Sequence, residues 1–397
     1  MTGRLKSATG SPVRQSSVRA HNLALVLQTV ANSADPISRA AVAGATGLTR
    51  ATVSALVDDL VTGALLTEVE PAPRNGAGRP AVGLTLASDG PAGLGLEINV
   101  DYRAACVVDL AGTVRHRLVE PGDQRLADPA TALAGLTRLA ARARTLAEAD
   151  GLTVAGAALA VPGLVAANGV VRVAPNLGWQ DVAVGDLLDG LPLIVDNEAN
   201  LAALSELGDL GTGGLPRDFV YVSGEIGIGA GIVLDGALFR GARGWSGEIG
   251  HIPIDADGPA CRCGARGCLE QYAGQEAILR SAGVPTVEAL TTAATAGAPA
   301  ALAALAAAGT ALGMAVATVV NLLDVKTIVL GGSYASLLPW LRDGIAAEAG
   351  RRVLTAAWSP VVLRAAALGP DAAMRGAAGA VIRALLDDPA AWLGRAR

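Results

Sequence analysis

Charged residues, aromatic residues and cysteine are all scarce in this chain of 397 residues. Charged residues make up 17% and aromatic residues 3% of it, whereas hydrophobic residues make up 51%. So large a share of apolar residues excludes an intrinsically disordered chain. Four cysteines are too few for the disulfide framework of a small secreted protein. At roughly 150 residues per domain, the length predicts two or three domains.

Lysine occurs only at Lys6 and Lys326, and the run from Ala289 to Leu323 contains no charged residue. This run is long enough to span a bilayer. Alanine dominates it and polar residues interrupt it, whereas membrane helices are richer in larger apolar residues, so we expect a buried helix. The first twenty residues contain no apolar block that would serve as a secretory signal. We therefore predict a cytoplasmic protein without membrane contact.

The two ends of the chain differ in charge. Residues 1–88 contain eight basic and five acidic residues, a balance of +3, and the remainder contains 23 basic and 31 acidic residues, a balance of -8. A basic first part joined to an acidic body suggests a nucleic-acid-binding module attached to a different domain. Three charges alone are a weak signal, so the pattern within that part matters more.

Residues 19–88 have the pattern of a winged helix-turn-helix domain, and residues 1–18 are predicted to be a flexible tail. Apolar residues recur at helical spacing in three stretches, and Ser38 and Thr49 are the expected N-caps of the second and third helices. Gly47 suits the tight turn between these two helices. Alternating apolar residues after the third helix predict a hairpin, which would form the wing.

In a helix-turn-helix, the start of the second helix of the motif enters the major groove of DNA, and a wing can contact a phosphate or the minor groove. The predicted DNA contacts are therefore polar or basic residues at the start of the third helix and at the wing tip: Thr49, Arg50, Thr52, Ser54 and Arg79. A helical hairpin with a polar face is the alternative. The Gly-Arg-Pro sequence at the predicted wing tip favours DNA binding.

From residue 89 onward, predicted strand meanders alternate with helices. This order predicts two related α/β lobes with a cleft between them. We place the first lobe at 89–200 and the second at 201–397, with the C-terminal helix returning to the first lobe.

Three of the four cysteines lie within eight positions of one another, shortly after a histidine. Thiolate and imidazole are preferred ligands of zinc, and a closed tetrahedral site needs four ligands. His251, Cys261, Cys263 and Cys268 supply four, so we predict a structural zinc ion within a loop at 247–270. Unpaired surface thiols beside a chance histidine are the alternative. The fourth cysteine, Cys106, lies in an apolar strand and is expected to be buried.

Several motifs of the body together resemble the ROK family, which comprises repressors, open reading frames and sugar kinases. They are Gly247-Glu248-Ile249-Gly250-His251, the cysteine cluster after it, Ala174-Pro175-Asn176-Leu177, Asp196-Asn197-Glu198-Ala199-Asn200, and Gly227-Ile228-Gly229-Ala230-Gly231-Ile232. The similarity covers about residues 93–385, and with the winged helix the whole chain resembles the repressor branch. The resemblance implies an α/β, actin-like (sugar-kinase) body, a sugar site in the cleft, and homodimers or tetramers.

In the resembled family, polar residues around the zinc loop face the hydroxyls of the sugar. The sugar contacts that the resemblance implies here are Asn176, Asn197, Glu198, Glu248, His251 and Glu270. Such groups pair with vicinal hydroxyls, and an unmatched buried polar group costs about 1–3 kcal/mol. Taken alone, each carboxylate could equally be a solvated acidic residue on the surface. The motifs around these residues favour sugar contact.

Both phosphate-binding loops of the family's kinases are altered in this sequence. The first, Asp-x-Gly-Gly-Thr, corresponds to Glu-Ile-Asn-Val-Asp at 97–101, and the second has Glu225-Ile226 where the kinases have Gly-Thr. The added carboxylates should repel ATP. Glu198 replaces the aspartate that acts as general base, and its longer side chain shifts the carboxylate. We therefore expect no kinase activity.

The predicted function is a sugar-responsive transcriptional regulator, most simply a repressor of carbohydrate-use genes. It would bind double-stranded operator DNA through the winged helix and a small sugar or sugar derivative in the cleft. An ATP-dependent sugar kinase with an added DNA-binding module is the alternative. A DNA-binding protein whose body only oligomerises is a third reading, which the retained Glu248, His251 and Glu270 disfavour.

Overall fold

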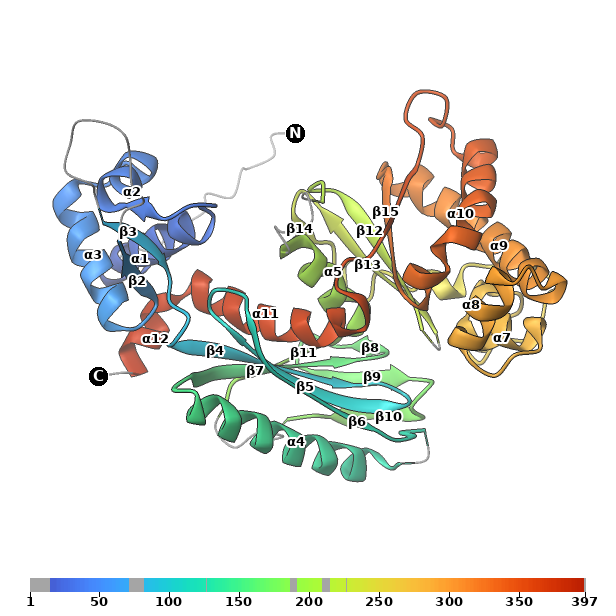
Figure 1. Cartoon of the computed structure of the whole chain (residues 1–397), viewed down its shortest axis with the longest axis horizontal. Coiled ribbons are helices and arrows are strands. Elements are labelled where there is room, and N and C mark those ends of the chain that lie inside the picture. Colours follow the sequence, from blue (N-terminus) through green and yellow to red (C-terminus); the bar gives the residue numbers. More distant parts are fainter. Residues whose placement is uncertain are drawn as a thin grey trace, which may run out of the picture.

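The computed structural model describes residues 15–70, 82–125, 127–185, 191–208, 215–225 and 227–395. Within these residues the chain forms a small N-terminal module followed by two α/β lobes (Figure 1). The N-terminal module lies at one end of the first lobe, and the second lobe lies beside the other end.

Three helices and a small three-stranded sheet form the N-terminal module. The elements are α1 (Gln15–Ala31), α2 (Arg39–Thr46), α3 (Arg50–Thr62), β1 (Ile37–Ser38), β2 (Leu66–Val69) and β3 (Gly83–Leu86), with strand order β1-β3-β2. Both predicted N-caps are present, because the Ser38 side chain accepts a hydrogen bond from the backbone N–H of Ala41 and Thr49 accepts one from Thr52. Gly47 follows α2 with a φ of 74°, a left-handed conformation that glycine adopts without strain. The antiparallel pair β2–β3 is the predicted hairpin.

The start of α1 differs from the sequence prediction. The helix begins at Gln15, four residues before the apolar pattern that predicted a helix from residue 19. The extra residues, Gln-Ser-Ser-Val, are mostly polar, so hydrophobic periodicity could not reveal this turn. Residues 1–14 of the predicted tail and the predicted wing tip, including Arg79, lie outside the described residues.

A five-stranded mixed sheet forms the centre of the first lobe. Its strands, in spatial order, are β11 (Leu193–Asn197), β7 (Thr153–Val161), β4 (Pro91–Ile98), β5 (Tyr102–Asp109) and β6 (Val114–Pro121). Strands β4, β5 and β6 form an antiparallel meander, whereas β7 runs parallel to both β4 and β11. Helix α4 (Pro129–Ala149) covers one face of this sheet, and α11 (Ala372–Asp387) covers the other (Figure 1). A small sheet of β8 (Leu164–Val165), β9 (Val170–Ala174) and β10 (Trp179–Ala183) completes the lobe.

The second lobe repeats this pattern. Its five strands, in spatial order, are β14 (Ala237–Leu238), β13 (Ile228–Leu234), β12 (Phe219–Gly224), β15 (Thr327–Gly332) and β16 (Val362–Ala365), and β12, β15 and β16 are parallel. The remaining helices are α5 (Glu198–Gly208), α6 (Glu270–Ala273), α7 (Gln275–Ala282), α8 (Val287–Thr295), α9 (Pro299–Leu323), α10 (Ser333–Arg352) and α12 (Pro389–Arg395). Successive residues of β12 face opposite sides, so Val220 packs in one apolar cluster with α9 and α10 while Tyr221 packs in another with α5 and α11.

The uncharged run of the sequence forms α8 and α9. Helix α9 is long and apolar enough to cross a membrane. However, 67% of the apolar stretch within this helix is buried inside the protein. It packs against α10 in the core of the second lobe. The expectation of a buried helix is therefore confirmed.

Helix α11 contacts both lobes through close approach of its backbone. A Cβ atom added at Gly95 in β4 would lie 2.0 Å from the carbonyl oxygen of Met374 in α11. One added at Gly376 in α11 would lie 1.9 Å from the carbonyl oxygen of Leu201 in α5. Only glycine fits at such separations, so α11 lies directly against both the first sheet and helix α5.

We predict that Gly376→Ala lowers the free energy of unfolding by about 1–3 kcal/mol, because the new methyl group meets the Leu201 carbonyl and forces α11 away from α5. Gly379→Ala is the matched control, since it lies in the same helix with no atom within 4 Å of its added Cβ. It should raise stability by roughly 0.5–1 kcal/mol through helix propensity. Urea unfolding followed by circular dichroism measures both. Equal stability of the two variants would contradict the packing described here.

Candidate functional site

The four predicted metal ligands converge on one point. The ligand atoms of His251, Cys261, Cys263 and Cys268 all lie within 4.8 Å of one another. The Cys263 and Cys268 sulfurs are 3.7 Å apart, and Cys261 Sγ is 3.8 Å from His251 Nδ1. Zinc–sulfur bonds of about 2.3 Å at the tetrahedral angle place neighbouring sulfurs about 3.8 Å apart. The cluster therefore has the donors and the spacing to hold a metal ion.

Glycines allow the cysteine loop to fold back around this point. Gly264 and Gly267 have φ values of 92° and 65°, and a Cβ atom added at Gly267 would lie 1.6 Å from the carbonyl oxygen of Asp255. The thiols differ in their surroundings. A hydrogen bond from the backbone of Ala265 lowers the pKa of Cys263, whereas burial raises the pKa of Cys268 to about 12. A bound cation would favour the thiolate form of both.

All six residues predicted to contact sugar line one cavity between the lobes. The first lobe contributes Asn176 and Asn197, α5 begins with Glu198, and the second lobe contributes Glu248, His251 and Glu270. Three further polar residues line the same cavity: Asn99, Glu225 and Arg262. In the sequence, Asn99 and Glu225 stand out only as changes to the phosphate loops, and no sequence pattern predicts a role for Arg262.

Glycines bring the turn before the cysteine loop, which forms one side of the cavity, close to the second sheet. Cβ atoms added at Gly247 and Gly250 would lie 1.9 Å and 2.4 Å from carbonyl oxygens of β13, so the turn Ile249–His251 packs directly on that strand. The turn places His251 with Nδ1 toward Cys261 while its ring also lines the cavity. One histidine can therefore contact both the metal point and a ligand through its two ring nitrogens.

The side chain of Asn197 is already engaged within the protein. Its Oδ1 accepts a hydrogen bond from the backbone N–H of Ala199 at 2.8 Å, and its Nδ2 donates one to the carbonyl of Gly163 at 2.9 Å. It thus fixes the start of α5, where Glu198 lies. Asn197 holds the wall of the cavity in place, and its remaining hydrogen-bonding capacity is smaller than the sequence motif suggested.

Buried carboxyl groups form the base of the cavity, where Glu198 and Glu225 line it and Glu97 lines the smaller pocket that shares these two residues. Burial and the nearby charge of Glu225 raise the pKa of Glu97 to about 8, and burial with the charges of Glu225 and Glu97 raises the pKa of Glu198. Tyr102 donates its hydroxyl to Glu97 Oε1 at 2.6 Å, and Asn99 donates Nδ2 to Glu225 Oε2 at 2.6 Å. The second oxygen of Glu97 has no hydrogen-bond partner within the described part of the chain. Such a base disfavours an anion and suits uncharged hydroxyl groups.

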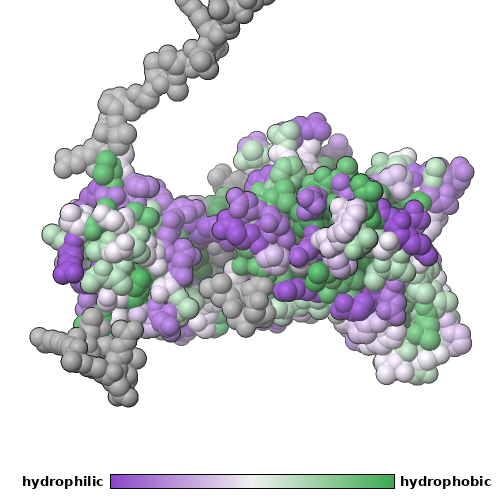
Figure 2. Space-filling view, turned by 90° about the horizontal axis from the view of Figure 1, so that it is seen from above, coloured by the Kyte–Doolittle hydropathy of each residue, from purple (hydrophilic) through white to green (hydrophobic). Residues whose placement is uncertain are grey.

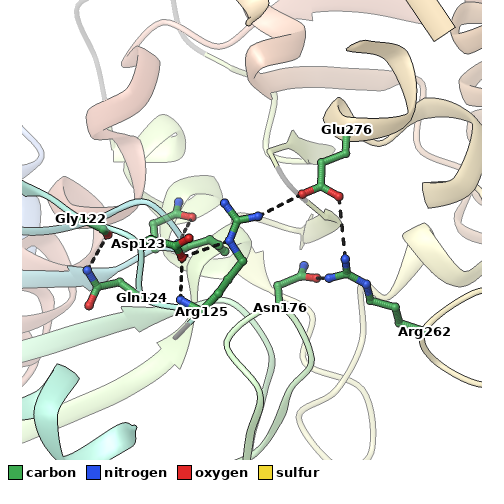
Figure 3. A network of polar contacts seen from close by, with 9 residues as sticks. Gly122, Asp123, Gln124, Arg125, Asn176, Arg262 and Glu276 are labelled. Atoms are coloured by element: carbon green, nitrogen blue, oxygen red, sulfur yellow. Dashed lines mark hydrogen bonds and ion pairs between the residues drawn. The ribbon is translucent and has the colours of Figure 1, made fainter. Parts of the chain in front are cut away.

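Four residues connect the lobes at the cavity (Figure 3). Glu276 of α7 lies 3.3 Å from Arg125 of the first lobe and 3.9 Å from Arg262 of the cysteine loop. Arg262 also donates a hydrogen bond to Asn176 Oδ1 at 3.4 Å. These exposed pairs are each worth at most about 1 kcal/mol, so a ligand can displace them. Their partners are far apart in sequence, and no local pattern predicted them.

Trp245 makes a second contact between the lobes. Its indole N–H donates a hydrogen bond to the carbonyl of Val165 in β8 at 3.2 Å, and the guanidinium of Arg243 lies 4.7 Å from the centroid of its ring. The two lobes are thus in contact at two separate places.

The predicted DNA contacts at the start of α3 are partly exposed. Thr49 and Arg50 are exposed, and Thr52 and Ser54 are half-buried. The hydroxyls of Thr49 and Thr52 lie 2.8 Å apart and help to cap the helix. Within the residues that the structure describes, the side chain of Arg50 makes no hydrogen bond or ion pair. Its guanidinium is thus available to a phosphate or a base.

The fold and the cavity together define a class of protein: a two-lobed body of the actin-like, sugar-kinase type, preceded by a winged helix-turn-helix. Comparison with known proteins gives the family. The ROK family model matches residues 93–384, and the chain belongs to this family.

Two relatives cover almost the whole chain. The xylose repressor of Bacillus spizizenii is 29% identical over 383 residues, which are 94% of this chain and 98% of that protein. The crystal structure of a ROK family transcriptional regulator, a homologue of the E. coli MLC protein, has a TM-score of 0.81 at 28% identity and covers 95% of this chain and 99% of that chain. The predicted fold class and the predicted repressor branch of the family are therefore confirmed.

Sugar kinases are related as well. The structure of a ROK family glucokinase from Streptomyces griseus, in complex with glucose and AMPPNP, has a TM-score of 0.64 at 27% identity and covers 73% of this chain and 98% of that chain. The kinase relationship therefore extends over most of the chain but less far than the relationship to regulators.

We predict that the purified protein carries about one metal ion per chain and that Cys263→Ser loses most of it, because the cluster then lacks one of four ligands. Elemental analysis of protein purified without chelator measures the metal content. Cys106→Ala is the control, since Cys106 is buried in β5 away from the cluster and its loss should leave the metal content unchanged. Unaltered protein without metal would contradict the assignment.

We predict that Glu97 makes the protein less stable as the pH rises. Because the folded-state pKa is raised to about 8, the group keeps its proton in the folded state but ionises in the unfolded state between its ordinary pKa and about pH 8. Over this window it reduces stability by at most about 1.4 kcal/mol per pH unit. Glu97→Gln should therefore show a shallower loss of stability between pH 5.5 and 8 in urea titrations. Glu148→Gln, at an exposed position of α4, should keep the original slope, and the same slope in Glu97→Gln would contradict the prediction.

Proposed function

We propose that this protein is a sugar-responsive transcriptional repressor that binds operator DNA through residues 19–88 and a sugar in the cavity between the lobes at 89–200 and 201–397. One observation carries the proposal: a single chain combines a winged helix, whose Arg50 is available to DNA, with an interlobe cavity lined by polar groups suited to hydroxyls. The similarity to a xylose repressor and to a ROK transcriptional regulator over 94–95% of the chain supports it.

DNA contact is assigned to the start of α3 and to the wing. The polar and basic residues at these places are Thr49, Arg50, Thr52, Ser54 and Arg79, the last of which lies outside the described residues. One recognition helix reads only a few base pairs, so tight binding needs two copies and a two-fold operator.

A homodimer or tetramer is therefore part of the proposal. The second lobe exposes apolar side chains that self-association could cover, and Figure 2 shows a hydrophobic area facing the viewer over this lobe. Leu322, Leu354 and Trp358 are 77%, 84% and 82% exposed. Like its proposed DNA target, the protein would be cytoplasmic.

Sugar binding is assigned to residues on both sides of the cavity. Glu248 and Glu270 accept hydrogen bonds from hydroxyls, His251 offers its second ring nitrogen, and Asn176 and Glu198 complete the ring of contacts. Gly227 leaves room for the ligand, since a Cβ atom there would lie 3.0 Å from both Asn176 and Glu270. The metal proposed at the cysteine cluster is a structural zinc ion, which would hold His251 in place.

We further propose that the protein has no kinase activity. Glu225 lines the cavity and Glu97 lines the smaller pocket next to it, and both carboxyl groups, when ionised, oppose the phosphates of ATP. Ile226, the other change in the second phosphate loop, lies outside the described residues. The second candidate, a sugar kinase with an added DNA-binding module, is favoured only by the relationship to glucokinases. A coupled assay of ATP consumption with D-glucose and D-xylose separates the two.

Gel-shift titrations test the proposal, using a duplex that the protein selects from a random pool. We expect D-xylose or D-glucose to weaken operator binding by the unaltered protein. Arg50→Ala should weaken operator binding at least tenfold at fixed salt and keep the metal, because it removes a DNA contact only. Glu270→Gln should bind the operator normally but respond at least tenfold less to the sugar, because it alters only the cavity. Selection of no duplex, or ATP consumption that depends on the sugar, would contradict the proposed function.

A further inference from the structure

Trp392 in the C-terminal helix α12 joins two parts of the protein that are otherwise separate. Its indole N–H donates a hydrogen bond, at 3.0 Å, to the carbonyl of Gly63, the residue that follows recognition helix α3. Its ring packs at the edge of the apolar core of the N-terminal module and also at the edge of the apolar cluster between the two lobes. In Figure 1, α12 lies against the N-terminal module at the end of α11.

The C-terminal helices fix the position of the N-terminal module. A Cβ atom added at Gly63 would lie 2.1 Å from Leu393 Cδ2, so α12 touches the backbone at the end of α3. Gln28 of α1 donates a hydrogen bond to Asp387 Oδ1 at 2.9 Å, and Leu385 of α11 is buried in the core of the module. A shift of α11 and α12 therefore moves the recognition helix with them.

The same helices contact the elements that carry the cavity. Helix α5 starts with Glu198 at the cavity, and its Leu201 carbonyl lies directly against Gly376 of α11. Further along α5, the buried carboxylate of Glu206 accepts hydrogen bonds from the backbone N–H groups of Ala367 and Leu368, just before α11 begins. A displacement of α5 is therefore passed to α11 by the backbone contact at Gly376 and by the hydrogen bonds of the buried Glu206 carboxylate.

A groove beneath Trp392 provides the room for such a movement. It has a volume of about 220 Å³ and lies between strands β7 and β11 and helices α11 and α12. Strand β11 contributes Ile194 to the groove and ends at Asn197 in the cavity wall. Trp392 lines the groove, so open space lies next to its side chain.

We infer that Trp392 is the positioning residue through which the state of the sugar cavity reaches the recognition helix. A ligand that moves α5 moves α11 and α12, and Trp392 transfers this movement to Gly63 and α3. The inference rests on the proposed function and adds the route of regulation. Coupling of this kind is reciprocal, so operator binding must also alter α5.

Trp392→Phe tests this inference, because it removes the indole N–H and keeps an aromatic ring. Gel shifts with the selected duplex, with and without 50 mM D-xylose or D-glucose, give the factor by which the sugar weakens operator binding. We expect this factor to fall at least fivefold in the variant, while operator affinity without sugar and the thermal shift caused by the sugar stay within threefold of the unaltered protein. Trp340→Phe, at a half-buried position of α10 in the second lobe, should keep the full factor. An undiminished factor in Trp392→Phe would overturn the inference.

Hydrogen exchange supplies a second readout that needs no sugar. Its first part uses the unaltered protein alone. Operator DNA should slow amide exchange in α5, at 198–208, of the unaltered protein at least threefold, and Trp392→Phe should abolish this effect. Unchanged exchange in α5 on operator binding would overturn the inference even if the variant failed to fold. If the unaltered protein binds the operator but neither sugar weakens binding, the proposed sugar response is wrong, and the exchange measurement still decides the role of Trp392.

Discussion

The direct backbone contact of α11 with both lobes is the constraint on which the rest of the structure depends. Small residues make it possible: Gly95 lets β4 approach α11, and Gly376 lets α11 approach α5. Alanines fill much of the remaining interface, so α5 and α11 pack closely between the two sheets. Because backbones cannot yield as long side chains do, the lobes and the helix that joins them move as packed units. The abundance of glycine and alanine in the sequence thus has a structural use at this interface.

The cavity between the lobes combines two kinds of polar surface. Its outer part carries groups that pair with hydroxyls, including Glu248, His251 and Glu270, next to the cysteine cluster. Its base carries carboxyl groups whose pKa values burial raises, Glu198 and Glu225. In a related fold that binds ATP, the base would need to attract phosphate. This difference is the ground for the proposal that the protein senses a sugar without phosphorylating it, although the backbone fold is shared.

Some features of the molecule were readable from short stretches of sequence. The N-caps at Ser38 and Thr49 depend on a side chain and an N–H three residues apart, and the metal cluster depends on four ligands within eighteen positions. The cavity residues were found through motifs that resemble a known family, not through spacing alone. By contrast, the extra first turn of α1 was missed because its residues carry no apolar period.

The sequence by itself determined the order of the elements and the candidate metal ligands, because these follow from periodicity and from the chemistry of side chains close together in the chain. Tertiary structure alone decided which distant residues meet. Arg262 reaches Asn176, Glu276 reaches Arg125, and Trp392 reaches Gly63 only because the lobes and the C-terminal helices pack as they do. Each of these pairs spans 86 to 329 positions, and no local pattern encodes a contact over such separations.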